Sequence, residues 1–257
     1  MTDRDLAARL AAVDLIIFDK DGTLIDFHGM WGGWAVELAT ALEASTGRSL
    51  RGALLRAYGV NARTRRTLAH GLLAATPMAR LREATVEIVV DAGTPQAAAE
   101  RAVAAAWQPP DPVTRSQPLA DLPALLGGLR AGGRQIAIAT TDDREPTMRT
   151  VGALGIGDLI DATICADDGV AVKPAQDMVF HLCALLGAPP ARTAVVGDSP
   201  SDLLMGRAAD VGLVVGVLSG VGRTRDMAPF ADVIVPSVAA LWPRTSMPVE
   251  NAGLPPP

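Results

Sequence analysis

The sequence predicts an α/β fold, a parallel sheet with helices on both faces, interrupted by an all-helical insert. Short apolar runs alternate with helical patterns from residue 119 onward, and this alternation is typical of such sheets. A similar apolar run lies at residues 13–18, whereas residues 26–117 show only helical periodicity. Polar clusters follow several of the predicted strands, at the end where parallel sheets bind their ligands.

The first predicted strand is the apolar run Val13–Phe18, whose length and β-branched residues favour a buried strand. It leads directly into Asp-Lys-Asp-Gly-Thr, residues 19–23. Carboxylates two positions apart, Asp19 and Asp21, can face one cleft at a strand end, and a divalent cation such as Mg²⁺ would offset their repulsion. The alternative is a surface Asp-Gly turn, which is common in proteins.

The insert is expected to be helical because its apolar residues recur every three or four positions. Thr94-Pro95 is a plausible helix start, with proline in the first turn. The expected helices are Trp34–Ala44, Leu54–Tyr58, Thr64–Leu73, Met78–Asp91 and Gln96–Trp107. The proline-rich segment Pro109–Pro118 is expected to link the insert to the rest of the chain.

After this linker, helices and strands are expected to alternate up to residue 235. The expected strands are Arg134–Thr140, Ala162–Ala166, Thr193–Gly197, Leu213–Leu218 and Val233–Val235. The expected helices are Leu119–Ala131, Pro146–Leu154, Ala175–Leu186 and Ser201–Ala209. Residues 246–257 contain four prolines and no periodicity, so we expect a disordered tail there.

Three further groups of polar residues are candidates for a site. The hydroxyls of Thr140 and Thr141, at the end of a predicted strand, can donate to phosphate oxygens or cap a helix. Lys173, next to a proline, is either held near the active end of the sheet or an ordinary surface charge. Of Asp198 and Asp202, one could ligate a metal while the other orients a ligand or the lysine. The alternative is that Asp198 or Ser199 caps the following helix.

These groups resemble, in the same order, the four motifs of the haloacid dehalogenase (HAD) superfamily. Residues 19–23 are similar to its first motif, Asp-x-Asp-Gly-Thr. Gly197-Asp198-Ser199, together with Asp202, is similar to the fourth motif. Thr140 and Lys173 match the second and third motifs by position. The resemblance covers residues 13 to about 240. It implies a Rossmann-like parallel sheet core at residues 1–25 and 118–245, and a helical cap domain of the C1 type at residues 26–117.

The resemblance also implies an activity, the hydrolysis of a small-molecule phosphate monoester through an aspartyl-phosphate. Asp19 would be the nucleophile, and Asp21 would be general acid and then general base. Thr140, Thr141 and Lys173 would bind the phosphoryl oxygens.

A bound Mg²⁺ is implied as the cofactor. Its ligands would be Asp19, the backbone carbonyl of Asp21, and Asp198. Asp202 would support Lys173 or the surroundings of the metal. Two positions depart from the common motifs: Thr141 stands where asparagine is often found, and Lys20 where an apolar or aromatic residue is frequent.

Within the superfamily, residues 214–222 and 231–234 resemble phosphoglycolate phosphatases. Asp21 favours phosphoryl transfer over carbon–halogen cleavage, because dehalogenases lack this second aspartate. A phosphomutase of the β-phosphoglucomutase kind shares all four motifs and stays an alternative. A non-catalytic binding module with the same fold is a further alternative, but we would expect it to have lost one of the motif residues.

The start of the insert holds aromatic residues, and three arginines follow later. His28, Trp31 and Trp34 could line the entrance to the site, or the tryptophans could be buried. A group of arginines could contact an anionic part of the substrate or form a solvated face: Arg63, Arg65 and Arg66.

Composition limits the remaining function classes. The formal charge of −5 without a basic run argues against nucleic-acid binding. No stretch approaches the roughly 20 apolar residues of a membrane span, and the N-terminus lacks a signal-peptide pattern, so we expect a cytoplasmic enzyme. Cys165 and Cys183 show no zinc-site spacing and are expected to be buried thiols. The oligomeric state is not indicated.

Overall fold

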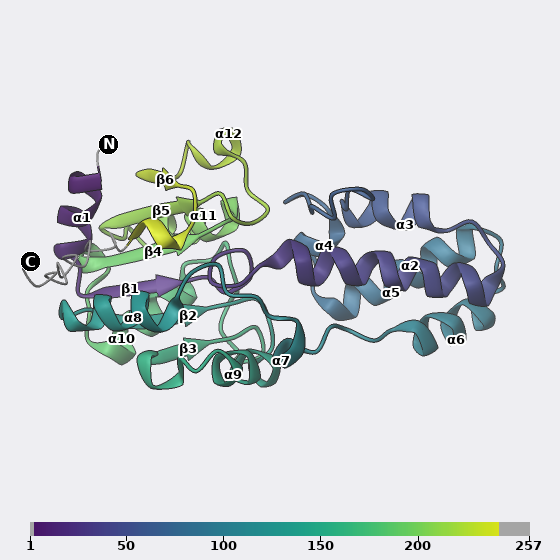
Figure 1. Cartoon of the computed structure of the whole chain (residues 1–257), viewed down its shortest axis with the longest axis horizontal. Helices are drawn as coiled ribbons and strands as arrows, with labels where there is room; N and C mark the ends of the chain where they lie inside the picture. Colours follow the sequence, from purple (N-terminus) through teal and green to yellow (C-terminus); the bar gives the residue numbers. More distant parts are fainter. Residues whose placement is uncertain (1–2, 242–257) are drawn as a thin grey trace, which may run out of the picture.

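A computed structural model describes residues 3–241 of the 257-residue chain, so the expected tail at residues 246–257 lies outside the described part. The core is a six-stranded sheet with the strand order β3-β2-β1-β4-β5-β6, and all its pairings are parallel (Figure 1). The strands are β1 (Leu15–Phe18), β2 (Gln135–Ala139), β3 (Ala162–Ile164), β4 (Thr193–Gly197), β5 (Leu213–Val217) and β6 (Val233–Val235). The predicted α/β fold class is confirmed.

Strand β1 lies at the centre of the sheet, where Ile16 is paired with Ile136 of β2 and Ala194 of β4. Its side chains alternate between two apolar cores, with Ile16 in one and Ile17 in the other. Because both faces are covered, the strand is a continuous apolar run rather than an alternating one. One core includes side chains of α1 (Asp3–Ala11), α8 (Leu122–Ala131) and α9 (Arg144–Ala153), and the other those of α10 (Asp177–Leu186) and α11 (Pro200–Ala208).

The insert between β1 and α8 is mostly helical and lies mostly beyond the end of the sheet toward which the strands point (Figure 1). Its elements are η1, a π-helix (His28–Gly32), α2 (Gly33–Thr46), α3 (Arg51–Tyr58), α4 (Leu72–Ala75), α5 (Met78–Asp91), α6 (Gln96–Ala106) and α7 (Pro112–Arg115). Trp34, Leu54, Leu81 and Val103 belong to a third apolar core. A core of its own supports our proposal that residues 26–117 form a separate cap domain.

The prediction of a helix at Thr64–Leu73 is wrong, since residues 61–71 form a loop and α4 starts only at Leu72. Gly59, in a left-handed conformation with φ 72°, ends α3. The Asn61 side chain then accepts the backbone N–H groups of Arg63 and Thr64 at 3.0 Å each, which competes with helix formation. Arg65 is also left-handed, with φ 58°.

Several short elements were not predicted. Helix α1 precedes β1, and α7 lies inside the expected linker Pro109–Pro118. The others are η1, η2 (Gly157–Leu159), η3 (Pro190–Arg192), α12 (Thr224–Met227) and η4 (Val238–Leu241). Cys165 and Cys183 are free and buried, as expected. Within residues 3–241, every helix is too short or too polar to cross a bilayer.

Candidate active site

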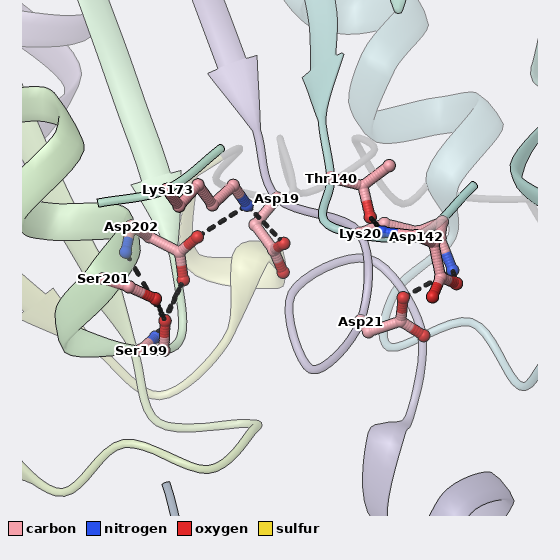
Figure 2. Close-up of polar contacts among 9 residues, drawn as sticks. All are labelled: Asp19, Lys20, Asp21, Thr140, Asp142, Lys173, Ser199, Ser201 and Asp202. Atoms are coloured by element: carbon pink, nitrogen blue, oxygen red, sulfur yellow. Dashed lines mark hydrogen bonds and ion pairs between the residues drawn. The ribbon is translucent and has the colours of Figure 1, made fainter. Parts of the chain in front are cut away.

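The predicted site residues come together at the carboxyl ends of three neighbouring strands. Asp19 follows β1, Thr140 follows β2 and Asp198 follows β4, and these strands are adjacent in the sheet. Lys173 comes from the connection between β3 and α10, and Figure 2 shows its ammonium group pointing at Asp19. Parallel pairing therefore gathers side chains that lie up to 179 positions apart in the sequence, from Asp19 to Asp198.

Lys173 is buried between two carboxylates. Its Nζ lies 2.6 Å from Asp19 Oδ1 and 2.6 Å from Asp202 Oδ1. Burial by itself lowers the pKa of Lys173, but the two carboxylates outweigh it and raise that pKa, so the ammonium stays charged. Asp202 is fixed in turn by Ser199, whose backbone N–H (3.0 Å) and hydroxyl (2.6 Å) both donate to Asp202 Oδ2.

The Ser199–Asp202 contact is a capping box at the start of α11. Helix α11 therefore holds the carboxylate of Asp202, which orients Lys173. From the sequence, Ser199 was considered only as a possible cap of the following helix, and it is the N-cap of α11. Its contact with Asp202 was not predicted, although its place between the two aspartates of the fourth motif was a signal.

Asp19, Asp198 and Asp202 form a buried acidic cluster, with one oxygen of each within 4.8 Å of the others. Burial raises the pKa of Asp19 to about 7; Lys173 opposes this less strongly, and the negative charge of Asp202 adds to it. Asp198 Oδ2 accepts the Val221 N–H at 2.6 Å, and the pKa of Asp198 is also raised, mainly by burial.

Within the described chain, the buried Oδ2 of Asp19 has no hydrogen-bond partner. A buried carboxylate oxygen without a partner is unfavourable unless a cation or donor approaches it. Oxygen ligands of this kind are those that hard divalent cations prefer. The cluster therefore fits a divalent cation, whose charge would favour the ionised forms of Asp19 and Asp198.

Gly22 allows the chain that follows Asp21 to pack tightly against the acidic cluster. It has φ +89°, and a Cβ at this position would lie 2.5 Å from Asp198 Oδ2. Gly133 provides a matched comparison, because it has φ +87° but no atom within 4 Å of an added Cβ.

We expect Gly133→Ala to lower the free energy of unfolding by about 1–2 kcal/mol, the cost of the left-handed backbone alone. Gly22→Ala should cost about 1–3 kcal/mol more, because its methyl group displaces Asp198. It should also lower the rate of the phosphate-ester hydrolysis that the motifs imply, whereas Gly133→Ala should not. Denaturant unfolding and initial rates check both expectations, and equal effects of the two substitutions would contradict the tight packing at Gly22.

Asp21 belongs to a second, partly buried ion-pair group (Figure 2). Lys20 Nζ lies 2.5 Å from Asp21 Oδ2 and 2.9 Å from Asp142 Oδ2. Trp31 donates its indole N–H to the other oxygen of Asp21 at 3.5 Å. Burial raises the pKa of Asp21 in spite of Lys20, which favours a role in proton transfer.

Lys20, a departure from the common motif, thus holds Asp21 in place. Asp142 was not identified from the sequence, although its position two residues after Thr140, at the same strand end, was a signal. Thr140 itself is buried, and its hydroxyl oxygen accepts the Asp142 N–H at 3.1 Å.

Two adjoining cavities open from these residues. The inner cavity is about 70 Å³ in volume and is lined by Asp19, Asp21, Thr140, Lys173 and Asp198, among others. The outer cavity is about 660 Å³ and extends to residues of the helical insert. Thr141 lines both cavities.

The aromatic residues at the start of the insert have different positions. Trp31 lines the outer cavity, whereas Trp34 is buried and stacks on Tyr58. His28 is buried and joins the insert to the core: Nδ1 accepts the Thr67 N–H (3.1 Å), and Nε2 lies 2.9 Å from the Gly220 carbonyl oxygen. The three arginines considered from the sequence are exposed and line neither cavity: Arg63, Arg65 and Arg66.

Comparisons with known proteins agree with this arrangement. Residues 13–210 match the family described as haloacid dehalogenase-like hydrolase. A phosphoglycolate phosphatase of Rhodospirillum rubrum is 30% identical over 200 residues, which cover 78% of each chain.

Solved structures of low sequence identity share the fold. A predicted phosphoglycolate phosphatase from Haemophilus somnus has a TM-score of 0.64 at 20% identity, covering 89% of this chain and 96% of the other. A HAD-superfamily hydrolase of subfamily IA from Geobacter sulfurreducens has a TM-score of 0.62 at 17% identity, covering 89% and 94%.

Proposed function

The chain belongs to the haloacid dehalogenase-like hydrolases, and from this premise we propose that it hydrolyses small-molecule phosphate monoesters through a phosphorylated Asp19. The observation that carries the proposal is the buried contact of Asp19 with Lys173, beside the acidic cluster and at the mouth of a cavity the size of a phosphoryl group. The names of phosphatase relatives support the same class of reaction.

In the first step, a carboxylate oxygen of Asp19 would attack phosphorus and form a P–O bond while the bond to the alcohol oxygen breaks. Asp21 would give its proton to the departing oxygen; its raised pKa and its contact with Trp31 suit this role. Lys173 and the hydroxyl of Thr140 would neutralise and orient the phosphoryl oxygens.

In the second step, Asp21, now ionised, would take a proton from a water molecule. The oxygen of that water would bond to phosphorus, the bond to Asp19 would break, and inorganic phosphate would leave. Both carboxyl groups are thereby restored, so that atoms and charges balance over the cycle.

We propose Mg²⁺ as the cofactor, held by Asp19, Asp198 and the backbone carbonyl of Asp21. When bound, it would offset the repulsion between the Asp19 carboxylate and the phosphate. Asp202 would act only through its contact with Lys173.

The proposal is tested by incubating the full chain with Mg²⁺ and a panel of phosphate monoesters that includes 2-phosphoglycolate and β-glucose 1-phosphate. We expect release of inorganic phosphate, with one phosphate formed per ester consumed. An isomerised sugar phosphate without free phosphate would indicate a phosphomutase instead. Neither product, with folded protein, would contradict a catalytic role.

A further inference from the structure

We propose that the preferred substrate is a phosphate monoester whose alcohol carries a bulky apolar group about the size of a ring, bound between Trp31 of the insert and Leu204 of the core. This inference rests on the proposed phosphatase function and specifies its substrate class. The size, the lining and the charges of the outer cavity each support it.

Each of the two cavities would hold a different part of the substrate. The inner cavity, about 70 Å³, has room for the phosphoryl group, and it shares Asp21, Lys173 and Ser199 with the outer cavity. The outer cavity, about 660 Å³, lies within the range of roughly 300–1,000 Å³ that is usual for sites of larger organic ligands. A two-carbon alcohol such as glycolate would leave most of this space to water.

The wall of the outer cavity carries apolar side chains on both sides, together with polar ones that are concentrated on the core side. The insert and the core contribute Trp31, Leu73, Pro77, Met78, Leu204 and Val221. Apolar side chains that face each other across a cavity favour an apolar ligand, because binding removes both surfaces from water.

Trp31 is held in place before the substrate arrives. Its ring centroid lies 6.4 Å from that of Phe27 and 5.8 Å from that of Trp34, the latter in an edge-on geometry. Its indole N–H points at Asp21 Oδ1. Because Asp21 would protonate the departing alcohol oxygen, the first carbons of the alcohol would lie beside the Trp31 ring.

The charges of the outer cavity do not favour a carboxylate on the alcohol. The basic residues that line it are Lys173, His70 and Arg225. Lys173 already forms ion pairs with Asp19 and Asp202. His70 is exposed, and Arg225 is exposed and paired with the neighbouring Asp226 at 3.3 Å. Within residues 3–241, no buried cation is therefore left to pair with a second anionic group in this cavity.

The test compares kcat/KM of the full chain with Mg²⁺ for benzyl phosphate, ethyl phosphate and 2-phosphoglycolate. All three are esters of primary hydroxyl groups, so the comparison avoids the activated leaving groups of aryl phosphates. We expect benzyl phosphate to exceed ethyl phosphate by about 10- to 100-fold, and to exceed 2-phosphoglycolate as well. A value for 2-phosphoglycolate or ethyl phosphate that equals or exceeds that for benzyl phosphate would overturn the inference.

Failure of the proposed function has a different result, because none of the three esters would then release phosphate.

Substitutions on the two walls test whether the apolar group of the substrate binds between them. Leu204→Ala and Met78→Ala should each lower the ratio of kcat/KM for benzyl to ethyl phosphate by about 3- to 10-fold. Leu185→Ala is the control and should leave the ratio unchanged, because Leu185 is exposed on α10 and does not line the cavity. An unchanged ratio in both wall variants, with their melting temperatures near that of the parent, would also overturn the inference.

Discussion

Replacement of Asp19 by asparagine is expected to abolish turnover, lowering kcat by roughly 10⁴-fold or more. The amide has nearly the same shape but is a poor nucleophile and cannot form the acyl phosphate. The fold should persist, because the substitution removes one negative charge from the cluster with Asp198, while Asp202 still pairs with Lys173. Initial rates of phosphate release and the unfolding midpoint measure the two effects.

A second readout identifies the chemical role of Asp19 directly. Acid quenching of the parent protein during turnover, followed by peptide mass analysis, should find one phosphoryl group on the peptide that contains residue 19. Asp158→Asn, which changes an exposed carboxylate of the core, is the matched control and should retain both activity and phosphorylation. Normal turnover by Asp19→Asn would refute the assignment of the nucleophile.

Removal of divalent cations should inactivate the enzyme. Treatment with EDTA is expected to lower the rate by roughly 10³-fold or more, since a bound cation supplies several kcal/mol of transition-state stabilisation. Added Mg²⁺ should restore the rate, whereas K⁺ at the same ionic strength should not.

Binding of the cation can also be measured without activity. Mg²⁺ should raise the unfolding midpoint of the parent protein, because a ligand that binds only the folded state stabilises it. Asp198→Asn should greatly weaken this rise, since it removes a charged ligand from the cluster. A metal-independent rate, or an equal rise in Asp198→Asn, would contradict the proposed coordination.

The core of the fold was predictable because its signals are local. A buried parallel strand needs an apolar run of a few residues, and several of these runs were followed by polar residues at the position where the strand ends. Strand β4 was predicted with the bounds that the structure has, and β1 differed only at its start, Leu15 instead of Val13. The HAD motifs then indicated which strand ends lie together.

The loop at residues 61–71 was not predictable from periodicity. Its apolar and polar residues fit a helix as well as a loop, and the outcome depends on backbone contacts with distant residues. Thr67 donates its N–H to His28, which in turn contacts Gly220 of the core. Such contacts outweigh the weak preference of a short segment for a helix.

The sequence alone therefore determined the α/β class and the identity of the residues at the strand ends, because hydrophobic period and motif spacing are properties of neighbouring residues. Only the tertiary structure decided that Lys20 forms ion pairs with both Asp21 and Asp142, and that Trp31 lines the outer cavity whereas Arg63, Arg65 and Arg66 do not. It also decided which two walls enclose this cavity. These contacts join residues on different elements, such as Lys20 and Asp142, 122 positions apart. Their distances are set by strand order and by the packing of the insert on the core, which no local pattern encodes.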